Sequence, residues 1–559
     1  MYSRTRMRIE NHLAKKGFNH EFEPDEDGYH IFRGKLPVKF GSMHISIKIK
    51  DWTLGEYPCI QIPDDHPLRQ KSMPHINYDG TVCYAEKGTV VLNVTYPEKA
   101  IEYCLQQASH VLSILRFRPQ QYLDDLKRDF WVYWSHQKQH IFRVQTLGFD
   151  WRQDCCYVIG DSKQPLDLWI TSDSDTCISQ LQTMHPDHGY VRLFTFPIIH
   201  YPQSLPSGFR KLPDTLQELL SWLALESQQA HRKLTNILAS RFYTDYNHFG
   251  CLICTPDQQL GFIELTELVE QGVLNLATLG ITEPSQAKGW ITRFSVEDQS
   301  PKTVHGRNQQ PMLDNKRILQ IGAGAIGGYL TDILVRLGAG TGLGALTIVD
   351  PEVLEAGNTS RHRLGMEAVG QSKAEALVHR MKKEFPWANL ISKNERMCDE
   401  VDFDYDLIID ATGDEPTTRF LNGEHVLNGV SQKGAMPSVL YAWIAGEGEA
   451  WETLLVENDR KLACRECLYF HEDSGNRKLR FPVTKKDPRP LHVGCQVTMP
   501  YAVTVAMSAA ALAGEVVVDW LYGKVQPHYR VRTRTGADVY DIQDVDIPSQ
   551  RDCPVCQKT

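Results

Sequence analysis

The apolar positions of this chain follow different repeats in three successive blocks. In the first block, residues 1–140, isoleucines occupy every second position of His44-Ile-Ser-Ile-Lys-Ile-Lys50, which predicts a strand with one buried face. Residues 29–34 alternate in the same way. Helical repeats are predicted over residues 6–16, 96–115 and 120–141. The first block is therefore expected to be an α+β domain.

The second block, residues 141–300, mixes short strands, predicted at 156–160 and 190–196, with a long helix over 214–240. Cys251-Leu-Ile-Cys254 has the spacing of a metal-ligand pair, but its flanking Gly and Pro favour a buried strand. No phosphate-binding glycine loop is found here, and the block is expected to be an α/β domain. A polar linker is predicted over residues 299–311.

The third block, residues 301–559, alternates between strands and helices. Strands are predicted at 318–321, 345–349 and 407–409, and helices at 326–337 and 371–385. This order is typical of a doubly wound parallel sheet, so the block is expected to be Rossmann-like.

Composition narrows the class of protein. The 559 residues carry a formal net charge of −9, which argues against nucleic acid or an anionic membrane as the main partner. No uninterrupted apolar run is long enough to span a bilayer, and the N-terminus lacks the apolar core of a signal sequence. A cytoplasmic location is therefore expected, where the 14 cysteines would be reduced thiols.

The third block opens with an apolar strand that runs into Gly322-x-Gly324-x-x-Gly327. Such glycines let the backbone approach phosphates, and the following helix N-terminus presents free amides to them. Asp350 ends the second strand, where a carboxylate can hold ribose hydroxyls. A dinucleotide-dependent dehydrogenase could share these features, so the loop alone does not choose the nucleotide.

The residues that follow favour ATP. Asn358, Arg361 and Lys373 would place an amide and two cations near a triphosphate, where they stabilise charge as a carboxylate attacks the α-phosphorus. Asp410-Ala-Thr-Gly-Asp414 adds two carboxylates, of which Asp414 is expected to carry Mg²⁺. Each cation alone would be read as part of a solvated helix face, but the ordered set predicts an ATP site.

With these motifs, the third block resembles the adenylating domain shared by ubiquitin-activating enzymes and by bacterial activators of sulfur-carrier proteins. The resemblance implies ATP–Mg²⁺ binding, adenylation of a protein C-terminus with release of pyrophosphate, and a homodimer. One departure is that the usual Arg-Gln pair reads Arg361-His362, which leaves the role of Arg363 open.

Two Cys-x-x-Cys pairs follow, Cys464/Cys467 and Cys553/Cys556. Four thiolates in two such pairs predict a tetrahedral structural Zn²⁺ with no open position for catalysis. Its expected role is to tie the C-terminus back to the domain.

Cys495 lies between the two pairs, just before an apolar helix predicted over 501–521. A thiol near a helix N-terminus has a lowered pKa and is a better nucleophile. In the family, a cysteine placed similarly takes the activated acyl group as a thioester. The preceding segment, 472–492, is predicted to be a flexible crossover.

The first block resembles a ubiquitin-conjugating domain through Glu56-Tyr-Pro-Cys-Ile-Gln-Ile-Pro63 and Pro74-His75-Ile76-Asn77, followed by Cys83. The resemblance implies that Cys83 receives the acyl group and that Asn77 donates a hydrogen bond to the oxyanion formed when an amine attacks. Ile76 replaces the proline of the family's turn, and the spacing to the cysteine is shorter.

The three blocks together resemble the fused ubiquitin-transfer-like proteins of bacterial CBASS antiphage operons. The resemblance implies adenylation of a partner protein's C-terminus, a thioester relay from Cys495 to Cys83, and transfer to a target amine. The implied partner is a cyclic-oligonucleotide synthase, and the middle block is implied to be a degenerate adenylation-like domain. Two alternatives stay open: a sulfur-carrier activator and a non-catalytic scaffold that binds a protein tail.

Overall fold

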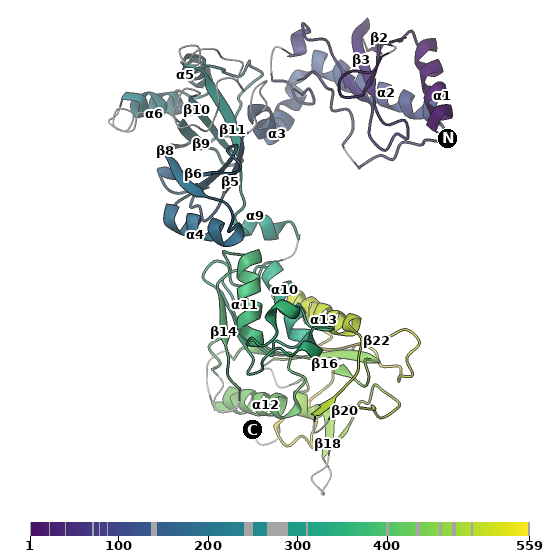
Figure 1. Cartoon of the computed structure of the whole chain (residues 1–559), viewed down its shortest axis with the longest axis vertical. Coiled ribbons are helices and arrows are strands. Elements are labelled where there is room, and N and C mark those ends of the chain that lie inside the picture. Colours follow the sequence, from purple (N-terminus) through teal and green to yellow (C-terminus); the bar gives the residue numbers. More distant parts are fainter. Residues whose placement is uncertain are drawn as a thin grey trace. The chain divides into compact units, whose positions relative to one another are not determined.

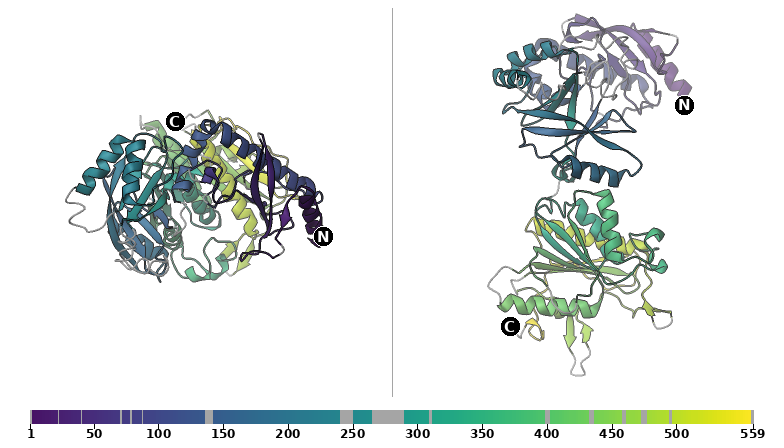
Figure 2. Two further views of the ribbon diagram at one scale, coloured as in Figure 1. Left: turned by 90° about the horizontal axis from the view of Figure 1, so that it is seen from above. Right: turned by 60° about the vertical axis from the view of Figure 1, so that its left-hand side comes forward.

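The structure is a computed structural model. It describes residues 2–21, 23–39, 41–69, 72–77, 79–86, 88–135, 142–239, 250–264, 289–308, 311–397, 402–431, 436–457, 461–471, 477–493 and 496–556. The chain divides into two compact units, Met1–Asp298 and Gln299–Thr559 (Figures 1 and 2). Each unit has its own buried apolar cores.

The first unit begins with a four-stranded antiparallel sheet in the order β1-β2-β3-β4. Met43, Ile45, Ile47 and Ile49 are all buried, which confirms the predicted strand with one apolar face. Its elements are α1 (Tyr2–Lys15), β1 (Asn19–His20), β2 (His30–Val38), β3 (Gly41–Ile49), β4 (Cys59–Gln61), η1 (Pro67–Arg69), α2 (Pro97–Phe117), η2 (Pro119–Tyr122) and α3 (Leu123–Ser135). Helices α1 and α2 pack on the buried face of the sheet, and the three helices predicted for this block are confirmed.

The rest of the first unit is a closed barrel in the order β10-β11-β5-β7-β6-β8-β9. Its strands are β5 (Arg143–Thr146), β6 (Cys155–Asp161), β7 (Asp167–Thr171), β8 (Tyr190–His200), β9 (Gly250–Cys254), β10 (Gln259–Glu264) and β11 (Ile291–Glu297), and its helices are α4 (Ser174–Met184), α5 (Leu216–Glu226) and α6 (Gln228–Ala239). Cys251 and Cys254 lie in a fully buried strand, as predicted. This barrel differs from an open parallel sheet, and the adenylation-like interpretation of the block stays a prediction.

The single helix predicted over 214–240 is wrong, because the chain leaves the helical conformation at Ser227 (φ −159°, ψ 110°). The Ser227 hydroxyl accepts a hydrogen bond from the backbone N–H of Ala230 and so caps α6. Serine side chains compete with the helical backbone in this way, and the apolar repeat on both sides of Ser227 hides the break.

The second unit is built on a seven-stranded sheet in the order β14-β13-β12-β15-β16-β17-β22. The first five strands are parallel, and β17 pairs antiparallel with both of its neighbours, β16 and β22. Its elements are α9 (Pro301–Gly306), β12 (Arg317–Ile321), α10 (Ala325–Arg336), β13 (Ala345–Val349), η5 (Ala356–Asn358), η6 (Met366–Ala368), α11 (Lys373–Glu384), β14 (Leu390–Lys393), β15 (Leu407–Asp410), α12 (Glu415–Ser431), β16 (Ser438–Ala445), β17 (Ala450–Val456), η7 (Arg465–Leu468), β18 (Tyr469–His471), β19 (Arg477–Leu479), β20 (Leu491–Val493), β21 (Gln496–Thr498), α13 (Val503–Leu521) and β22 (Tyr529–Thr533).

Helices cover both faces of this sheet. α10, α11 and α13 share one core with the sheet, whereas α12 packs on the opposite face (Figure 1). The mixed α/β class and the Rossmann-like C-terminal unit are thereby confirmed. The ubiquitin-conjugating-like character of residues 1–140 stays a prediction.

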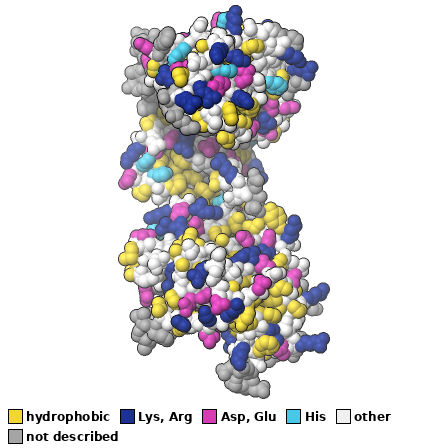
Figure 3. Space-filling view, turned by 90° about the vertical axis from the view of Figure 1, so that its right-hand side faces the viewer, with side chains coloured by type: hydrophobic (Ala, Val, Ile, Leu, Met, Phe, Trp, Pro, Cys, Tyr) yellow, Lys and Arg dark blue, Asp and Glu magenta, His cyan; other side chains and the backbone are white. Residues whose placement is uncertain are grey.

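Two segments differ from their sequence-based interpretation. The predicted linker contains α9, whose His305 is buried and binds the backbone oxygen of Arg336 through Nδ1 at 2.9 Å. The helix α13 is long and apolar enough by composition to cross a membrane, but half of it is buried and it packs in the core of the second unit. On the face in Figure 3, basic and acidic side chains are interspersed.

Candidate functional site

The glycine loop takes its shape from close backbone contacts. Gly322 has φ +94°, and a Cβ there would meet the backbone of Ala411 and Thr412 at 2.9 Å. A Cβ on Gly327 would overlap the carbonyl oxygen of Gly322, whereas one on Gly324 would meet nothing within 4 Å. The fold therefore requires glycine at positions 322 and 327. Gly324, the residue just before α10, has open space beside it.

Buried side chains hold this loop from behind. Gln320 donates from Nε2 to the carbonyl oxygens of Gly322 (2.9 Å) and Gly327 (3.0 Å). His362 accepts the N–H of Leu364 at Nδ1 (3.0 Å), so its Nε2–H donates to the carbonyl oxygen of Ala323 at 2.6 Å. Burial lowers the pKa of His362, which keeps the ring in this neutral form. His362, which stands where the family's pair has glutamine, therefore supports the glycine loop.

Asp350 also fixes the loop, because its Oδ2 accepts the N–H of Ala323 at 2.7 Å and its Oδ1 accepts that of Glu352 at 2.8 Å. A cavity of about 170 Å³ opens beside it. Of the predicted site residues, the cavity is lined by Gly322, Gly324, Asp350 and Asp414. The exposed Arg396 lines it as well. The sequence did not predict Arg396 as a site residue, because it belongs to no recognisable motif.

The three residues predicted to hold the triphosphate do not line this cavity. Lys373 is buried and forms an ion pair with Glu352, which does line it. Asn358 accepts the backbone N–H of Glu355 at 3.0 Å, and the guanidinium of Arg361 lies 5.2 Å from the ring centre of Tyr501. Arg363, whose role was open, pairs with Asp332 and Glu384 and so links α10 to α11.

The two predicted carboxylates have different surroundings. Asp410 is buried, accepts hydrogen bonds from Thr412 and Thr418, and has its pKa raised by burial. Asp414 is exposed at the cavity and caps α12 through the N–H (3.0 Å) and hydroxyl (2.6 Å) of Thr417. Asp414 therefore fits a Mg²⁺ ligand better than Asp410, which shapes the loop that carries Asp414.

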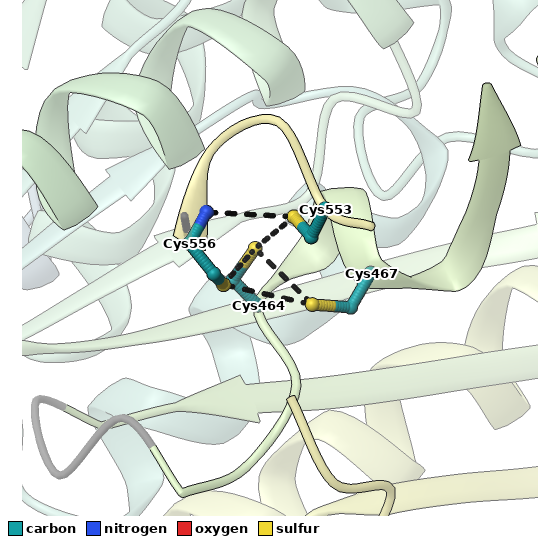
Figure 4. Close-up of side chains that lie close together, drawn as sticks. All are labelled: Cys464, Cys467, Cys553 and Cys556. Carbon is teal, nitrogen blue, oxygen red and sulfur yellow. Dashed lines mark hydrogen bonds between the residues drawn. The ribbon is translucent and has the colours of Figure 1, made fainter. Parts of the chain in front are cut away.

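The four cysteines of the two Cys-x-x-Cys pairs converge (Figure 4). The Sγ of Cys464 lies 3.8 Å from those of Cys467 and Cys553 and 3.4 Å from that of Cys556, and Cys467 and Cys556 are 3.6 Å apart. Four sulfurs at Zn–S bonds of about 2.3 Å would stand about 3.8 Å apart in a tetrahedron. The residues therefore fit a structural Zn²⁺.

The helix α12 connects the cysteine cluster to the nucleotide cavity. Its buried Asn422 donates to the Sγ of Cys464 (3.6 Å) and accepts the backbone N–H of Arg465 (2.9 Å). The side chain of Arg465 donates to Glu415, the first residue of α12, at 3.0 Å. Arg465 lies between Cys464 and Cys467, so this contact ties the N-terminal end of α12, next to Asp414, to the first cysteine pair.

Cys83 lies in a hairpin of the first unit. Residues 76 and 82 form an antiparallel bridge, and the N–H of Cys83 donates to the carbonyl oxygen of His75 at 2.8 Å. Ile76 is buried, so a core residue replaces the family's proline. Asn77 is half-buried, and its backbone carbonyl oxygen accepts the N–H of Gly80 at 2.9 Å, which closes the turn. The turn thus brings Asn77 and Cys83 to one hairpin.

The Cys83 residue is exposed as a whole, but desolvation, together with the carboxylates of Glu86 and Asp129, raises the pKa of its thiol. Cys83 is therefore mostly protonated at neutral pH and becomes a better nucleophile as the pH rises.

Cys495 lies outside the described residues. The strands on either side of it, β20 and β21, pair with each other up to Val493 and Gln496. In the described part of the segment 472–492, β19 pairs with β18 and Val483 is buried in the core, and the flexible crossover stays a prediction.

Three comparisons show which known proteins this chain is similar to. The ThiF family model matches residues 298–555. The chain is 28% identical over 551 residues to the ATP-dependent ubiquitin transferase-like protein Cap2 of Pseudomonas aeruginosa, with 97% of each chain covered. It is 26% identical over 513 residues to the protein of the same name from Vibrio cholerae, covering 83% of this chain and 84% of that one.

Among solved structures, E. coli MccB with ATP aligns over 44% of this chain and 68% of that chain, with a TM-score of 0.34 and 15% identity. The family and full-length matches confirm the resemblance that the motifs predicted. Over 97% of its length the chain is therefore similar to an ATP-dependent ubiquitin transferase-like protein, and its residues 298–555 match the ThiF family.

Proposed function

We propose that this enzyme joins the C-terminus of a partner protein to an amine in four chemical steps. The partner's carboxylate attacks the α-phosphorus of ATP, and pyrophosphate leaves. The Cys495 thiolate attacks the acyl carbon, and AMP leaves. The Cys83 thiolate then displaces Cys495, and an amine displaces Cys83 with loss of a proton, which gives an amide.

The geometry of the second unit supports the first step. The glycine loop and the N-terminus of α10 would hold phosphate oxygens, and Asp350 lies where ribose would bind. Mg²⁺ held by Asp414 would neutralise charge on the leaving pyrophosphate. Arg396 is a candidate partner for the phosphates. Lys373 would have to break its ion pair with Glu352 before it could bind the nucleotide.

One observation carries the proposal. The similarity to Cap2 covers 97% of this chain, so it includes both the nucleotide cavity and the Cys83 hairpin. A sulfur-carrier activator needs no conjugating domain, and a tail-binding scaffold needs no nucleotide cavity. We further propose that the partner is a cyclic-oligonucleotide synthase of a CBASS operon, and that the enzyme is a cytoplasmic homodimer.

The test uses the full chain, ATP and Mg²⁺, and the synthase encoded beside it. Products are separated on a denaturing gel with and without thiol, and ATP–pyrophosphate exchange is measured in parallel. Wild type should give a thiol-sensitive adduct and a thiol-resistant conjugate. Cys83→Ala should keep exchange and the Cys495 adduct but lose the conjugate, and Cys495→Ala should keep exchange alone.

Cys155→Ala is the matched control, because Cys155 is a half-buried thiol of the barrel, outside both predicted carriers. It should behave as wild type. Full conjugate from Cys83→Ala would refute the two-thiol relay, and the absence of exchange in wild type would favour a scaffold. A sulfur-carrier activator would give exchange but no thiol-resistant conjugate.

A further inference from the structure

The helix α3 belongs to the core of the barrel. Its Phe130 and Trp134 are fully buried in the cluster that holds Trp222 and Phe262. The indole N–H of Trp134 donates to the carbonyl oxygen of Gly261 at 2.8 Å. Side-chain packing and a hydrogen bond to β10 therefore fix the position of the C-terminal half of α3.

The same helix reaches the hairpin that carries Cys83. The hydroxyl of Tyr133 accepts the backbone N–H of His75 at 2.9 Å, and Asp125 Oδ2 lies 3.6 Å from His75 Nε2. The carbonyl oxygen of His75 accepts the N–H of Cys83. The His75 backbone is thus hydrogen-bonded to the barrel helix through its N–H and to Cys83 through its carbonyl.

The conformation of His75 needs such support. Its φ is +60°, in the left-handed region that a histidine adopts at a cost. Strained backbones of this kind persist only where the surrounding structure holds them. With no bond from Tyr133, the His75 peptide would be free to relax to a negative φ, which would move the carbonyl that positions Cys83.

We propose that Tyr133 is a positioning residue for Cys83, and that the barrel acts in the final acyl transfer by holding Tyr133 against His75. The middle block thereby has a role that needs no nucleotide site of its own. Burial raises the pKa of Tyr133 to about 12, so the phenol keeps its proton across the neutral range. The role of Cys83 as acyl carrier rests on the proposed function, but its dependence on Tyr133 can be measured without that function.

The first test compares full-length wild type with Tyr133→Phe and with the control Tyr201→Phe. Tyr201 is a buried tyrosine of the same unit whose hydroxyl binds Gln203 at 2.8 Å. Alkylation of Cys83 by iodoacetamide, followed by peptide mass spectrometry from pH 6.5 to 9.5, reports the thiol's surroundings. Tyr133→Phe should displace the pH profile or change the limiting rate at least threefold, while Tyr201→Phe should change neither.

The second test follows single-turnover discharge of the Cys83 thioester to hydroxylamine. Tyr133→Phe should slow discharge about tenfold and leave ATP–pyrophosphate exchange unchanged. If no thioester forms even in wild type, the proposed function fails while the alkylation test still decides the role of Tyr133. An unaltered alkylation profile in Tyr133→Phe would overturn the positioning role.

A double-mutant cycle identifies the route. Glycine adopts φ +60° without strain, so His75→Gly should make the hairpin less dependent on Tyr133. In the His75→Gly background, Tyr133→Phe should change Cys83 alkylation less than twofold. Equal effects of Tyr133→Phe in both backgrounds would show that Tyr133 acts by another route. Trp134→Phe, which removes the bond to β10, should reproduce the Tyr133→Phe profile in part, and a wild-type profile there would overturn the role of the barrel.

Discussion

At the scale of single residues, Gly327 and Gly324 occupy the same loop but differ in surroundings. Gly327→Ala would place its Cβ against the carbonyl oxygen of Gly322, so the loop must shift, at a cost of about 1–3 kcal/mol. Gly324→Ala meets open space and has a negative φ of −76°, so it should cost less than about 1 kcal/mol, the difference between glycine and alanine at a helix N-cap. Urea unfolding of the two variants checks this pair. Equal stability of both would contradict the close contact.

His362 gives the second unit a dependence on pH. Its pKa is lowered in the folded protein, mainly by burial, from an unfolded value of about 6.5. Above that value both states hold a neutral ring, so the group adds no pH dependence. As the pH falls below about 6.5, the unfolded chain binds the proton first, and folding stability is lost.

Lowering the pH from 7.5 to 5.5 should therefore reduce the free energy of unfolding of wild type. In His362→Gln the reduction should be smaller by about 1 kcal/mol. The exposed His379 on α11 supplies the control His379→Gln, which should follow wild type. Urea titrations at the two pH values measure the difference. Identical pH dependence in wild type and His362→Gln would mean that the imidazole of His362 is protonated as readily in the folded protein as in the unfolded chain.

At the scale of elements, α12 should transmit the state of the cysteine cluster to the nucleotide cavity. Removal of Zn²⁺ by a chelator would release Cys464 and with it Asn422 and Arg465, which hold the start of α12. We expect the dissociation constant of a non-hydrolysable ATP analogue to rise about tenfold, or about 1.4 kcal/mol. Calorimetric titration measures this, with metal content determined in parallel.

Cys254→Ser is the control for this experiment, because Cys254 is a buried thiol of the barrel outside the cluster. It should retain metal and affinity, while Cys467→Ser should lose both. A metal-free protein with its full affinity for the nucleotide would rule out this role of α12.

Elements differed in how far sequence could predict them. The parallel sheet and glycine loop follow from short-range repeats, and the spacing of two cysteine pairs suffices to expect their convergence. The barrel could not be foreseen, because its closure pairs strands far apart in the chain, such as β5 with β11. The ion pair of Lys373 with Glu352 and the support from His362 were likewise missed, because both depend on tertiary neighbours.

At the scale of the whole molecule, one chain joins an adenylating unit to a unit that carries Cys83. Covalent joining makes transfer between the two predicted carriers intramolecular, with an effective concentration that can reach about the millimolar range for flexible linkers. Each carrier nevertheless belongs to a unit with its own core. Stability and ligand response should therefore be separable between the units.

A nucleotide that binds the second unit should stabilise that unit alone. An ATP analogue with Mg²⁺ at about 100 times its dissociation constant should add about 2.7 kcal/mol to the stability of Gln299–Thr559. Hydrogen exchange followed by mass spectrometry can report each unit separately. Slower exchange is expected in β12 and α10, with no change in β2 or β3. Asp414→Asn should reduce the effect by weakening Mg²⁺ binding, because a neutral amide holds the cation less tightly than a carboxylate. Protection that extended equally into the first unit would mean that the two units respond as one body.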